Sequence, residues 1–305
     1  MRLVTRSDFD GLVTAVLLNK LNMIDDMLFV HPKDMQDGKV DITKNDILTN
    51  VPYMAGCGMW FDHHASELRR SQEENFQFEG EVRIADSAAR VVYDYFGGRD
   101  KFGVALDDIM RGVDKADAAH FSKEDILNPT GWDLISFIMD ARTGLGRYRD
   151  YRISNYQLME KLVELCATHT VEEILQDEDV QERVKRYYEL NELFVEMLKT
   201  HTRIDGNVII TDLRDVETIY PGNRFMIYAL YPEQNVSLWI VDGFRKKNCA
   251  IACGYSIINK TCTTHVGHLM RAHGGGGHEA AGTCQVPYDN ANTVIEEIVA
   301  NFKQA

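Results

Sequence analysis

Short apolar runs separated by polar turns and amphipathic segments fill the first hundred residues, and their spacing predicts a parallel α/β domain. Strands are expected at residues 3–5, 27–31, 46–49, 57–61 and 82–85. Helices are expected at residues 12–21 and 88–96, the second with Ser87 as its N-cap and with an apolar stripe that suits a buried face. A strand, an acidic turn and a helix form the opening unit of a doubly wound sheet, so we expect the short strands to lie parallel.

From residue 101 the pattern becomes helical, and after residue 204 it becomes rich in strands. Helices are expected at 105–119, 132–141, 151–167 and 171–200, strands at 208–211, 224–230, 236–241 and 250–256, and helices again at 264–272 and 291–302. A helix of about 30 residues spans about 45 Å, which is enough to connect two domains, although such a helix also suits packing on the first domain.

The expected fold class is therefore α/β, with three parts in order along the chain. An N-terminal parallel-sheet α/β domain covers residues 1–180, a linker helix covers 181–203, and a smaller C-terminal mixed α/β domain covers 204–305.

Charge and composition narrow the classes of function. The 305 residues are 45% hydrophobic, which provides a large core, and their formal net charge is -14. Such a charge repels phosphate backbones, so we expect no binding to long duplex nucleic acid, while a small anionic substrate in a metal-bearing pocket stays compatible. Six cysteines are too few for a disulfide scaffold. The chain shows neither a signal-peptide core nor an apolar run of about 18–20 residues, so we expect a cytoplasmic protein with reduced thiols that spans no membrane.

An acid and two imidazoles follow the strand predicted at 57–61. Asp62, His63 and His64 come where that strand ends, and ligands of open α/β sheets bind outside the carboxyl ends of the strands. Imidazole is a common metal ligand, and a neighbouring carboxylate commonly fixes its tautomer. These residues favour a metal site. The alternative is that Asp62 caps a helix and that both histidines lie on the surface.

Two carboxylates and a glycine follow the first predicted strand. Asp8 and Asp10 lie on one turn before Gly11, and carboxylate oxygens are the ligands that hard cations such as Mn²⁺ or Mg²⁺ prefer. The alternative is an acidic helix cap, which needs one aspartate and not two.

Four consecutive glycines occupy residues 274–277 and are followed by His278. Glycine in a regular element costs on the order of 1 kcal/mol relative to alanine, so such a run favours a place where peptide N–H groups approach a ligand closely. A nest of N–H groups that leads into a helical turn binds phosphate, and His278 can donate to the same anion. The alternative is a flexible linker.

Two further groups of residues have the chemistry of possible sites. The spacing of Cys249, Cys253 and Cys262 matches no strong zinc template, so we expect buried thiols. Four arginines form a cationic cluster that indicates a solvated face, with a phosphate-gathering rim as the alternative: Arg142, Arg147, Arg149 and Arg152.

The order of these motifs resembles the DHH phosphoesterase superfamily, and in particular its exopolyphosphatase-related group. The glycine segment is similar to the DHHA1-type C-terminal domain of that superfamily. The resemblance covers nearly the whole chain. It implies a DHH domain that holds Mn²⁺, with Mg²⁺ or Co²⁺ as other ions, joined by a helix to a domain that grips the substrate.

The resemblance also implies roles for individual residues. Asp8, Asp10, Asp62, His63 and Asp117 match the metal-binding motifs, with Asp114 as an alternative to Asp117. The catalytic motif corresponds to Asp62, His63 and His64, the last beside the scissile phosphate. The phosphate-binding loop corresponds to Gly275, Gly276, Gly277 and His278.

Two positions depart from the family pattern. Family members often have a metal-binding histidine where this chain has Arg6, and a metal-bridging aspartate where it has Asn50. The sequence therefore leaves two alternatives, a two-metal centre and a one-metal site formed by Asp10, His63 and Asp117.

The expected function is hydrolysis of a phosphodiester or phosphoanhydride bond by a Mn²⁺-dependent phosphoesterase. Its expected substrate is small: polyphosphate, a short oligonucleotide or a nucleotide. The alternative is a family member that binds a nucleotide or phosphate without hydrolysis and acts in regulation. The oligomeric state stays open, with a homodimer among the alternatives.

Overall fold

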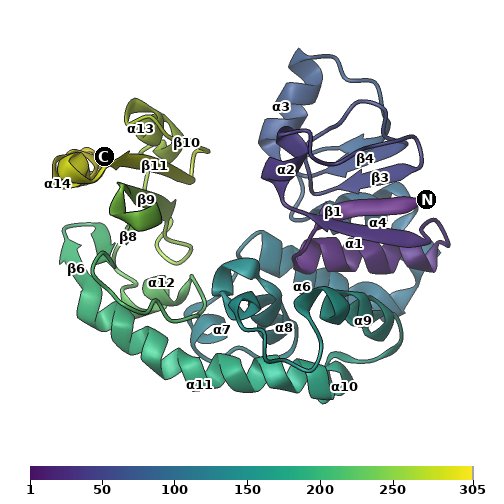
Figure 1. Ribbon diagram of the computed structural model, residues 1–305. Coiled ribbons are helices and arrows are strands. Elements are labelled where there is room, and N and C mark those ends of the chain that lie inside the picture. The colour runs from purple at the N-terminus through teal and green to yellow at the C-terminus, as the bar shows by residue number, and fades with distance from the viewer. Residues whose placement is uncertain (304–305) are drawn as a thin grey trace. The chain divides into compact units, whose positions relative to one another are not determined.

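The structure is a computed structural model that describes residues 1–303, and the chain forms two units (Figure 1). Unit 1 contains Met1–His120 and Pro129–Arg186, and unit 2 contains Phe121–Asn128 and the chain from Tyr187 onward. The chain passes from the first unit to the second within helix α11 (Glu178–His201). The division into 1–180, 181–203 and 204–305 stays a proposal about how the chain is organised for function.

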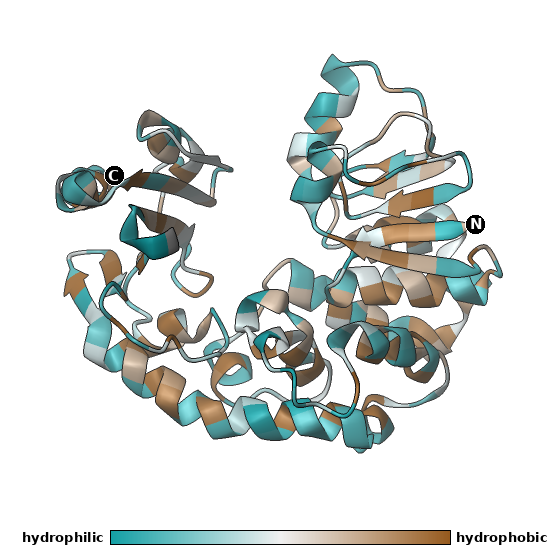
Figure 2. Cartoon of the chain, viewed as in Figure 1, coloured by the Kyte–Doolittle hydropathy of each residue, from teal (hydrophilic) through white to brown (hydrophobic). Residues whose placement is uncertain are grey.

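Unit 1 is built on a five-stranded parallel sheet in the order β2-β1-β3-β4-β5, as the sequence predicts. Its strands are β1 (Arg2–Arg6), β2 (Asp26–Val30), β3 (Asp46–Thr49), β4 (Met59–Asp62) and β5 (Glu79–Val82). Every residue of β3 and β4 is buried, and apolar residues occupy the middle of β3 and the first three positions of β4, as is usual in a sheet covered on both faces (Figure 2). The strand order reverses between β1 and β3, and ligands bind at such a switch point.

Unit 1 also contains a series of helices. They are α1 (Phe9–Lys20), α2 (Pro32–Gln36), α3 (Ala65–Glu73), α4 (Ala88–Tyr95), α5 (Gly98–Phe102), α6 (Asp107–Asp117), α8 (Gly131–Met139), α9 (Asn155–Thr168) and α10 (Val171–Ile174), with 3₁₀ turns at Val104–Leu106, Ala141–Thr143 and Leu145–Arg147. Helix α1 is buried from Phe9 to Leu18 because it contacts β1, α4, α6 and α9. Its start is therefore fixed in position under the end of β1.

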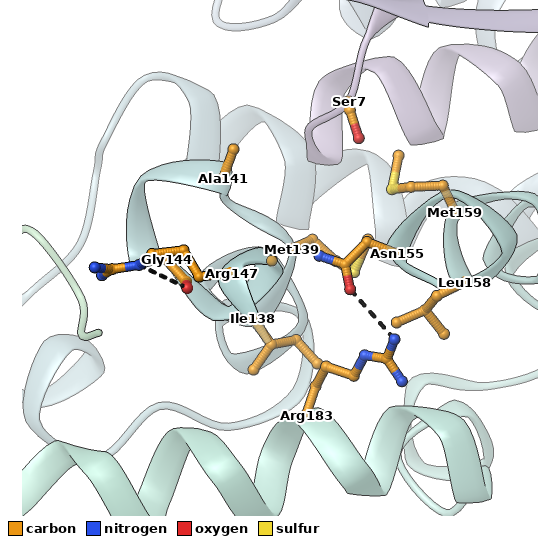
Figure 3. A pocket seen from close by; sticks show the side chains of 11 residues that line it. Ser7, Ile138, Met139, Ala141, Gly144, Arg147, Asn155, Leu158, Met159 and Arg183 are labelled. Carbon is orange, nitrogen blue, oxygen red and sulfur yellow. Dashed lines mark hydrogen bonds between the residues drawn. The ribbon is translucent and has the colours of Figure 1, made fainter. Parts of the chain in front are cut away.

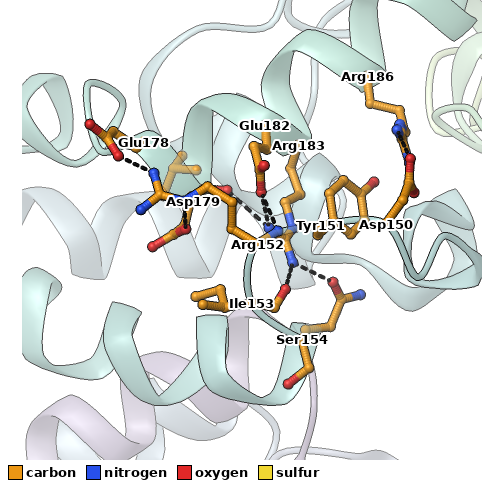
Figure 4. A network of polar contacts seen from close by, with 12 residues as sticks. Asp150, Tyr151, Arg152, Ile153, Ser154, Glu178, Asp179, Glu182, Arg183 and Arg186 are labelled. Atoms are coloured by element: carbon orange, nitrogen blue, oxygen red, sulfur yellow. Dashed lines mark hydrogen bonds and ion pairs between the residues drawn. The ribbon is translucent and has the colours of Figure 1, made fainter.

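Arginines at the start of α11 fasten this helix to the loop before α9 (Figure 4). Arg183 is 1% exposed, donates to the carbonyl oxygen of Ile153 at 2.6 Å, and lies 3.8 Å from the ring centroid of Tyr151. Arg186 makes two hydrogen bonds to the carboxylate of Asp150, at 2.6 and 2.7 Å. Both guanidinium groups thus attach the first turns of α11 to unit 1.

Unit 2 contains a six-stranded mixed sheet in the order β10-β11-β9-β8-β7-β6, in which β7 and β8 are parallel and the other pairs antiparallel. The strands are β6 (Thr202–Asp205), β7 (Val208–Asp212), β8 (Val236–Asp242), β9 (Asn248–Tyr255), β10 (Gly276–Gly277) and β11 (Ala281–Pro287). The helices are α7 (Lys123–Leu127), α12 (Met226–Leu230), α13 (Val266–Ala272) and α14 (Ala291–Lys303), with 3₁₀ turns at Phe244–Lys246 and Tyr288–Asn290. This architecture confirms the predicted mixed α/β part.

The core of unit 2 lies between its sheet and helices α13 and α14. Val266 and Met270 of α13 and Ile298 of α14 pack there with Cys249 and Cys253 of β9. The cysteines are buried and free, as predicted, and burial raises the pKa of the Cys253 thiol. Helix α7 packs on α12, where the Phe121 and Phe225 rings lie 5.6 Å apart.

Two predictions about unit 2 are wrong. Residues 224–230 were expected as a strand, yet Met226–Leu230 form helix α12. Four successive residues from 226 to 229 are buried, and an unbroken apolar run does not distinguish a strand from a buried helix. Strand β11 was missed because its residues were assigned to the glycine loop, although its burial alternates along the whole strand.

Three other expectations need correction. The strand expected at 82–85 lies at Glu79–Val82, and the helix expected at 171–200 is interrupted between α10 and α11. The glycine run does not lead into a helical turn. It follows the end of α13 and forms β10, which pairs with β11 as a hairpin. Within residues 1–303, no helix is both long and apolar enough to cross a bilayer.

Candidate metal centre

Three neighbouring strands of unit 1 end at the same edge of the sheet. Asp8 follows β1, Asn50 follows β3, and His63 follows β4. Because parallel strands direct their carboxyl ends to one edge, residues far apart in sequence meet there.

Asp10, His63 and Asp117 form a cluster of possible metal ligands. Within residues 1–303, it is the one group of three or more His, Cys, Asp or Glu residues whose ligand atoms lie close enough together to hold one ion. Their ligand atoms lie within 4.8 Å of one another. The Nε2 atom of His63 is 3.0 Å from Asp117 Oδ2 and 4.0 Å from Asp10 Oδ2. Two carboxylates and an imidazole are a donor set that suits a divalent cation such as Mn²⁺.

The backbone fixes the orientation of His63. Its Nδ1–H donates to the carbonyl oxygen of Ala85 at 3.1 Å. A carbonyl only accepts, so in the neutral imidazole that binds a metal the proton lies on Nδ1 and the Nε2 lone pair faces Asp10 and Asp117. Nε2 is buried and has no well-aligned hydrogen-bond partner among residues 1–303. An orphaned nitrogen between two carboxylates fits a metal ligand.

The N-terminus of α4 holds Asp10. The two carboxylate oxygens accept hydrogen bonds from the backbone N–H groups of Ala88 at 3.0 Å and Ala89 at 2.7 Å. These groups stabilise the carboxylate, as helix N-termini do. Burial and the neighbouring charge of Asp117 nevertheless raise the pKa of Asp10 to about 7.

Protons and cations compete for this centre. Burial alone would lower the pKa of His63, but the adjacent carboxylates of Asp117 and Asp10 raise it to about 10. Burial alone would raise the pKa of Asp117, but the neighbouring imidazole of His63 lowers it. Since a metal ligand must be deprotonated, binding of an ion here releases protons.

Asp62 positions His64 and lies outside the group of three. One Asp62 oxygen accepts from the backbone N–H of His64 at 2.7 Å and from its Nδ1–H at 2.8 Å. Asp62 is 1% exposed, while His64 is partly accessible. The imidazole is therefore held with its Nε2 atom available to a bound molecule.

The structure separates the two candidate aspartates of α6. Asp117 faces His63, whereas Asp114 accepts two hydrogen bonds from Arg90, at 2.9 and 2.6 Å, and one from the hydroxyl of Ser87 at 2.7 Å. Asp114 thus fastens α6 to α4 and does not join the metal group.

Asp8 also lies outside the group of three. It caps α1 by accepting from the N–H of Gly11 at 3.0 Å, as the alternative interpretation held. Its carboxylate pairs with Arg6 at 3.1 Å, and the side-chain amide nitrogen of Asn50 lies 3.3 Å away. Both positions that depart from the family pattern thus contact Asp8.

A hollow of about 280 Å³ lies between α8, α9 and the start of α11, with Ser7 at one side (Figure 3). We call it the Ser7 hollow; its lining residues include Ser7, Ile138, Met139, Asn155, Leu158, Met159 and Arg183. Its walls are mainly apolar, and Ser7 directly precedes Asp8 on the acidic turn. An apolar surface therefore adjoins the acidic end of β1.

The glycine hairpin of unit 2 has two kinds of glycine. A Cβ atom at Gly275 would lie 2.0 Å from the carbonyl oxygen of Thr283, and one at Gly277 2.2 Å from that of Ala281. These glycines are required by close packing on β11. A Cβ atom at Gly276 would meet nothing within 4 Å, so protein contacts do not account for that glycine. The His278 side chain is exposed beside it.

The sequence did not indicate the backbone groups that hold the centre. The carbonyl of Ala85 and the N–H groups of Ala88 and Ala89 position His63 and Asp10. One signal was available, because the predicted N-cap Ser87 marks the start of α4 and small residues follow it. Such a helix start lets a carboxylate approach closely.

A doubly wound sheet that gathers two carboxylates and an imidazole at its carboxyl edge, in a chain that continues into a mixed-sheet unit, is typical of hydrolases of the phosphoesterase class. No protein-family model and no curated protein matches the chain. Among solved structures it is similar to the pGpG-specific phosphodiesterase PggH from Vibrio cholerae, with 46% identity, 99% of each chain covered and a TM-score of 0.88. The chain belongs to the DHH/DHHA1 phosphoesterase superfamily and is an enzyme of that superfamily.

More distant structures share the fold alone. RecJ from Thermus thermophilus in complex with Mn²⁺ is 12% identical and has a TM-score of 0.53, with 100% of this chain and 52% of RecJ covered. CDC45 from Entamoeba histolytica is 9% identical and has a TM-score of 0.51, with 99% of this chain and 95% of CDC45 covered.

Proposed function

We propose that the chain is a Mn²⁺-dependent phosphodiesterase that hydrolyses a short linear dinucleotide of the pGpG type. The observation that carries the proposal is the group of Asp10, His63 and Asp117, whose ligand atoms lie within 4.8 Å of one another. It occurs in a chain that is 46% identical to a pGpG-specific phosphodiesterase over 99% of its length.

The residues of unit 1 support this chemistry. A divalent ion bound by the group of three would supply Lewis-acid polarisation of a phosphoryl oxygen and activation of water. His64, held by Asp62 through Nδ1–H, would place its Nε2 atom against the phosphoryl oxygens and stabilise the charge that develops there. Mn²⁺ suits the mixed oxygen and nitrogen ligands, and Mg²⁺ or Co²⁺ are the other ions to test.

The surroundings support a small substrate that contains a base. The net charge of -14 opposes long polyanions. The apolar walls of the Ser7 hollow suit a nucleobase better than a bare polyphosphate chain. In unit 2, the open position at Gly276 and the exposed His278 support the predicted role of the hairpin in binding a phosphate.

The test is hydrolysis of pGpG by the purified chain in the presence of Mn²⁺. We expect cleavage of the phosphodiester bond with uptake of one water, so that each pGpG yields two GMP. Removal of metal with EDTA and the Asp117→Ala variant should abolish turnover, while the matched Asp114→Ala variant should keep it. Faster hydrolysis of polyphosphate or of longer oligonucleotides than of pGpG would contradict the substrate assignment.

A second candidate is a member that binds the nucleotide without hydrolysis. Arg6 and Asn50, which surround Asp8, favour it because they replace expected metal ligands. A rise in melting temperature with pGpG but no GMP release, at saturating Mn²⁺, would support this candidate over the enzyme.

A further inference from the structure

A guanidinium group lies beside the predicted metal centre. The Nε atom of Arg6 is 3.1 Å from Asp8 Oδ2, and both side chains are largely buried, at 30% and 15% exposure. Nε makes the shortest contact of Arg6 with the Asp8 carboxylate, and neither Nη group forms a hydrogen bond within residues 1–303. They are therefore available to the oxygens of an anion.

The amide of Asn50 also presents a donor to Asp8. Asn50 follows β3 with a φ of 55°, and its Nδ2 atom lies 3.3 and 3.5 Å from the two Asp8 oxygens. A carboxylate only accepts, so the NH₂ group and not the carbonyl oxygen must face it. Asn50 Oδ1 is buried and has no hydrogen-bond partner among residues 1–303. The group that Asn50 presents to Asp8 is therefore an N–H donor and not a lone pair.

The charges of the site favour a single ion. Once a bound ion has displaced their protons, Asp8, Asp10 and Asp117 carry three negative charges, and the guanidinium groups of Arg6 and Arg142 carry two positive charges beside them. The single negative charge that remains is already more than offset by one divalent cation. A second divalent cation would add to this excess of positive charge beside a guanidinium group that is already paired.

We propose that the centre takes one divalent ion, at Asp10, His63 and Asp117, and that the guanidinium of Arg6 occupies the place of a second cation and binds the substrate phosphate. The inference rests on the proposed function and deepens it. Asp8 then serves to hold Arg6, and Asn50 completes the donors around Asp8. Arg6 differs from an ion in that chelators do not remove it and its charge does not depend on pH in the ordinary range.

The first test counts ions in the full-length protein. After equilibration with Mn²⁺, native mass spectrometry should show one ion per chain, and electron paramagnetic resonance should show the six-line spectrum of an isolated Mn²⁺. Two ions per chain with an exchange-coupled spectrum would overturn the inference and leave the phosphoesterase proposal intact. Absence of any bound ion would overturn both.

The second test replaces Arg6 and Asn50, the two residues that differ from the family pattern. The Arg6→His and Asn50→Asp double variant should bind two Mn²⁺ per chain, since it replaces two donors with two ligands. The matched control is Arg99→His, because Arg99 pairs with Asp107 at 3.0 Å and neither residue belongs to the predicted centre; it should still bind one ion. A folded double variant that binds only one ion would contradict the inference. If the double variant fails to fold, the ion count of the natural chain decides.

The third test addresses the contact with the substrate. Arg6→Gln removes the charge without adding a metal ligand, so the count should stay at one ion while the KM for pGpG rises at least tenfold. An unchanged KM would show that Arg6 does not bind the phosphate.

Discussion

Asp114 and Asp117 lie one turn apart on α6, and we expect their replacement by alanine to affect different properties. Loss of Asp114 should lower the stability of the fold, whereas loss of Asp117 should weaken Mn²⁺ binding. Asp114 accepts two hydrogen bonds from the Arg90 guanidinium and one from the Ser87 hydroxyl, which join α6 to α4. A hydrogen bond to a charged group contributes roughly 1.5–3 kcal/mol. The pair is 28% and 17% exposed, and Arg90 can turn to Asp94, now 3.7 Å away. We therefore expect Asp114→Ala to cost about 2–3 kcal/mol in total.

Thermal unfolding with and without Mn²⁺ measures both the stability of the metal-free fold and the stabilisation that bound Mn²⁺ adds. For a unit of this size, a loss of that magnitude lowers Tm by about 4–12 °C. An ion at 100 times its Kd adds about 2.7 kcal/mol, and a 100-fold weaker Kd reduces this gain to about 0.4 kcal/mol. Asp114→Ala should thus have a lower Tm but the full Mn²⁺-induced rise, whereas Asp117→Ala should lose most of that rise.

The reverse result would refute the reasoning. If Asp114→Ala abolished the Mn²⁺-induced rise while its metal-free Tm stayed unchanged, Asp114 would be the ligand. Calorimetric titration of both variants with Mn²⁺ gives the Kd directly and separates weaker binding from a less stable fold.

Three other predictions follow from the described contacts. Asp62→Asn should leave the Kd for Mn²⁺ within about twofold but lower kcat by about 10–100-fold, because it weakens the support of His64; an equally large loss of Mn²⁺ affinity in titration would instead make Asp62 a ligand. The pKa of Asp10 is raised from 3.8 to about 7, so its contribution to metal-free stability is complete below pH 3.8 and is lost as the pH rises through 7. The Mn²⁺-induced rise in Tm should therefore be larger at pH 8 than at pH 5.5, and equal rises at both values would contradict this. Gly276→Ala should keep the Tm and raise the KM for pGpG, whereas Gly275→Ala, whose methyl group would meet β11, should lower the Tm; an unchanged KM for Gly276→Ala would argue against a phosphate at the hairpin.

The parallel sheet could be predicted because its strands are short apolar runs that each end in polar residues. β3 and β4 are completely buried, and Asp62 stands at the carboxyl end of β4 as expected. Residues 224–230 could not be assigned in the same way. Their apolar run has no period, and only the surrounding structure shows that they form α12.

The metal-binding residues were predicted from the spacing of acids and histidines in the sequence, and spacing alone does not distinguish two aspartates on the same helix face. Asp114 and Asp117 differ by three positions, which places both on one face of a helix. Ser87 and Arg90 of α4 decide between them by engaging Asp114, and that contact joins residues more than 20 positions apart. Apart from the N-cap Ser87, the sequence carries no signature of the backbone groups that hold His63 and Asp10, since every residue carries a carbonyl and nearly every residue an N–H.

Helix α7 has a consequence for how this chain is cut into fragments. The segment Phe121–Asn128, which contains α7, lies in sequence between two segments of unit 1, yet its Phe121 ring packs against Phe225 of unit 2. A polypeptide that ends at Arg186 would keep the segment Phe121–Asn128 but lack Phe225, the residue on which Phe121 packs. A polypeptide that begins at Tyr187 would lack this segment and expose the apolar surface around Phe225. Expression of either half alone should give a sticky, aggregation-prone product, and grafting unit 2 onto another protein requires two junctions.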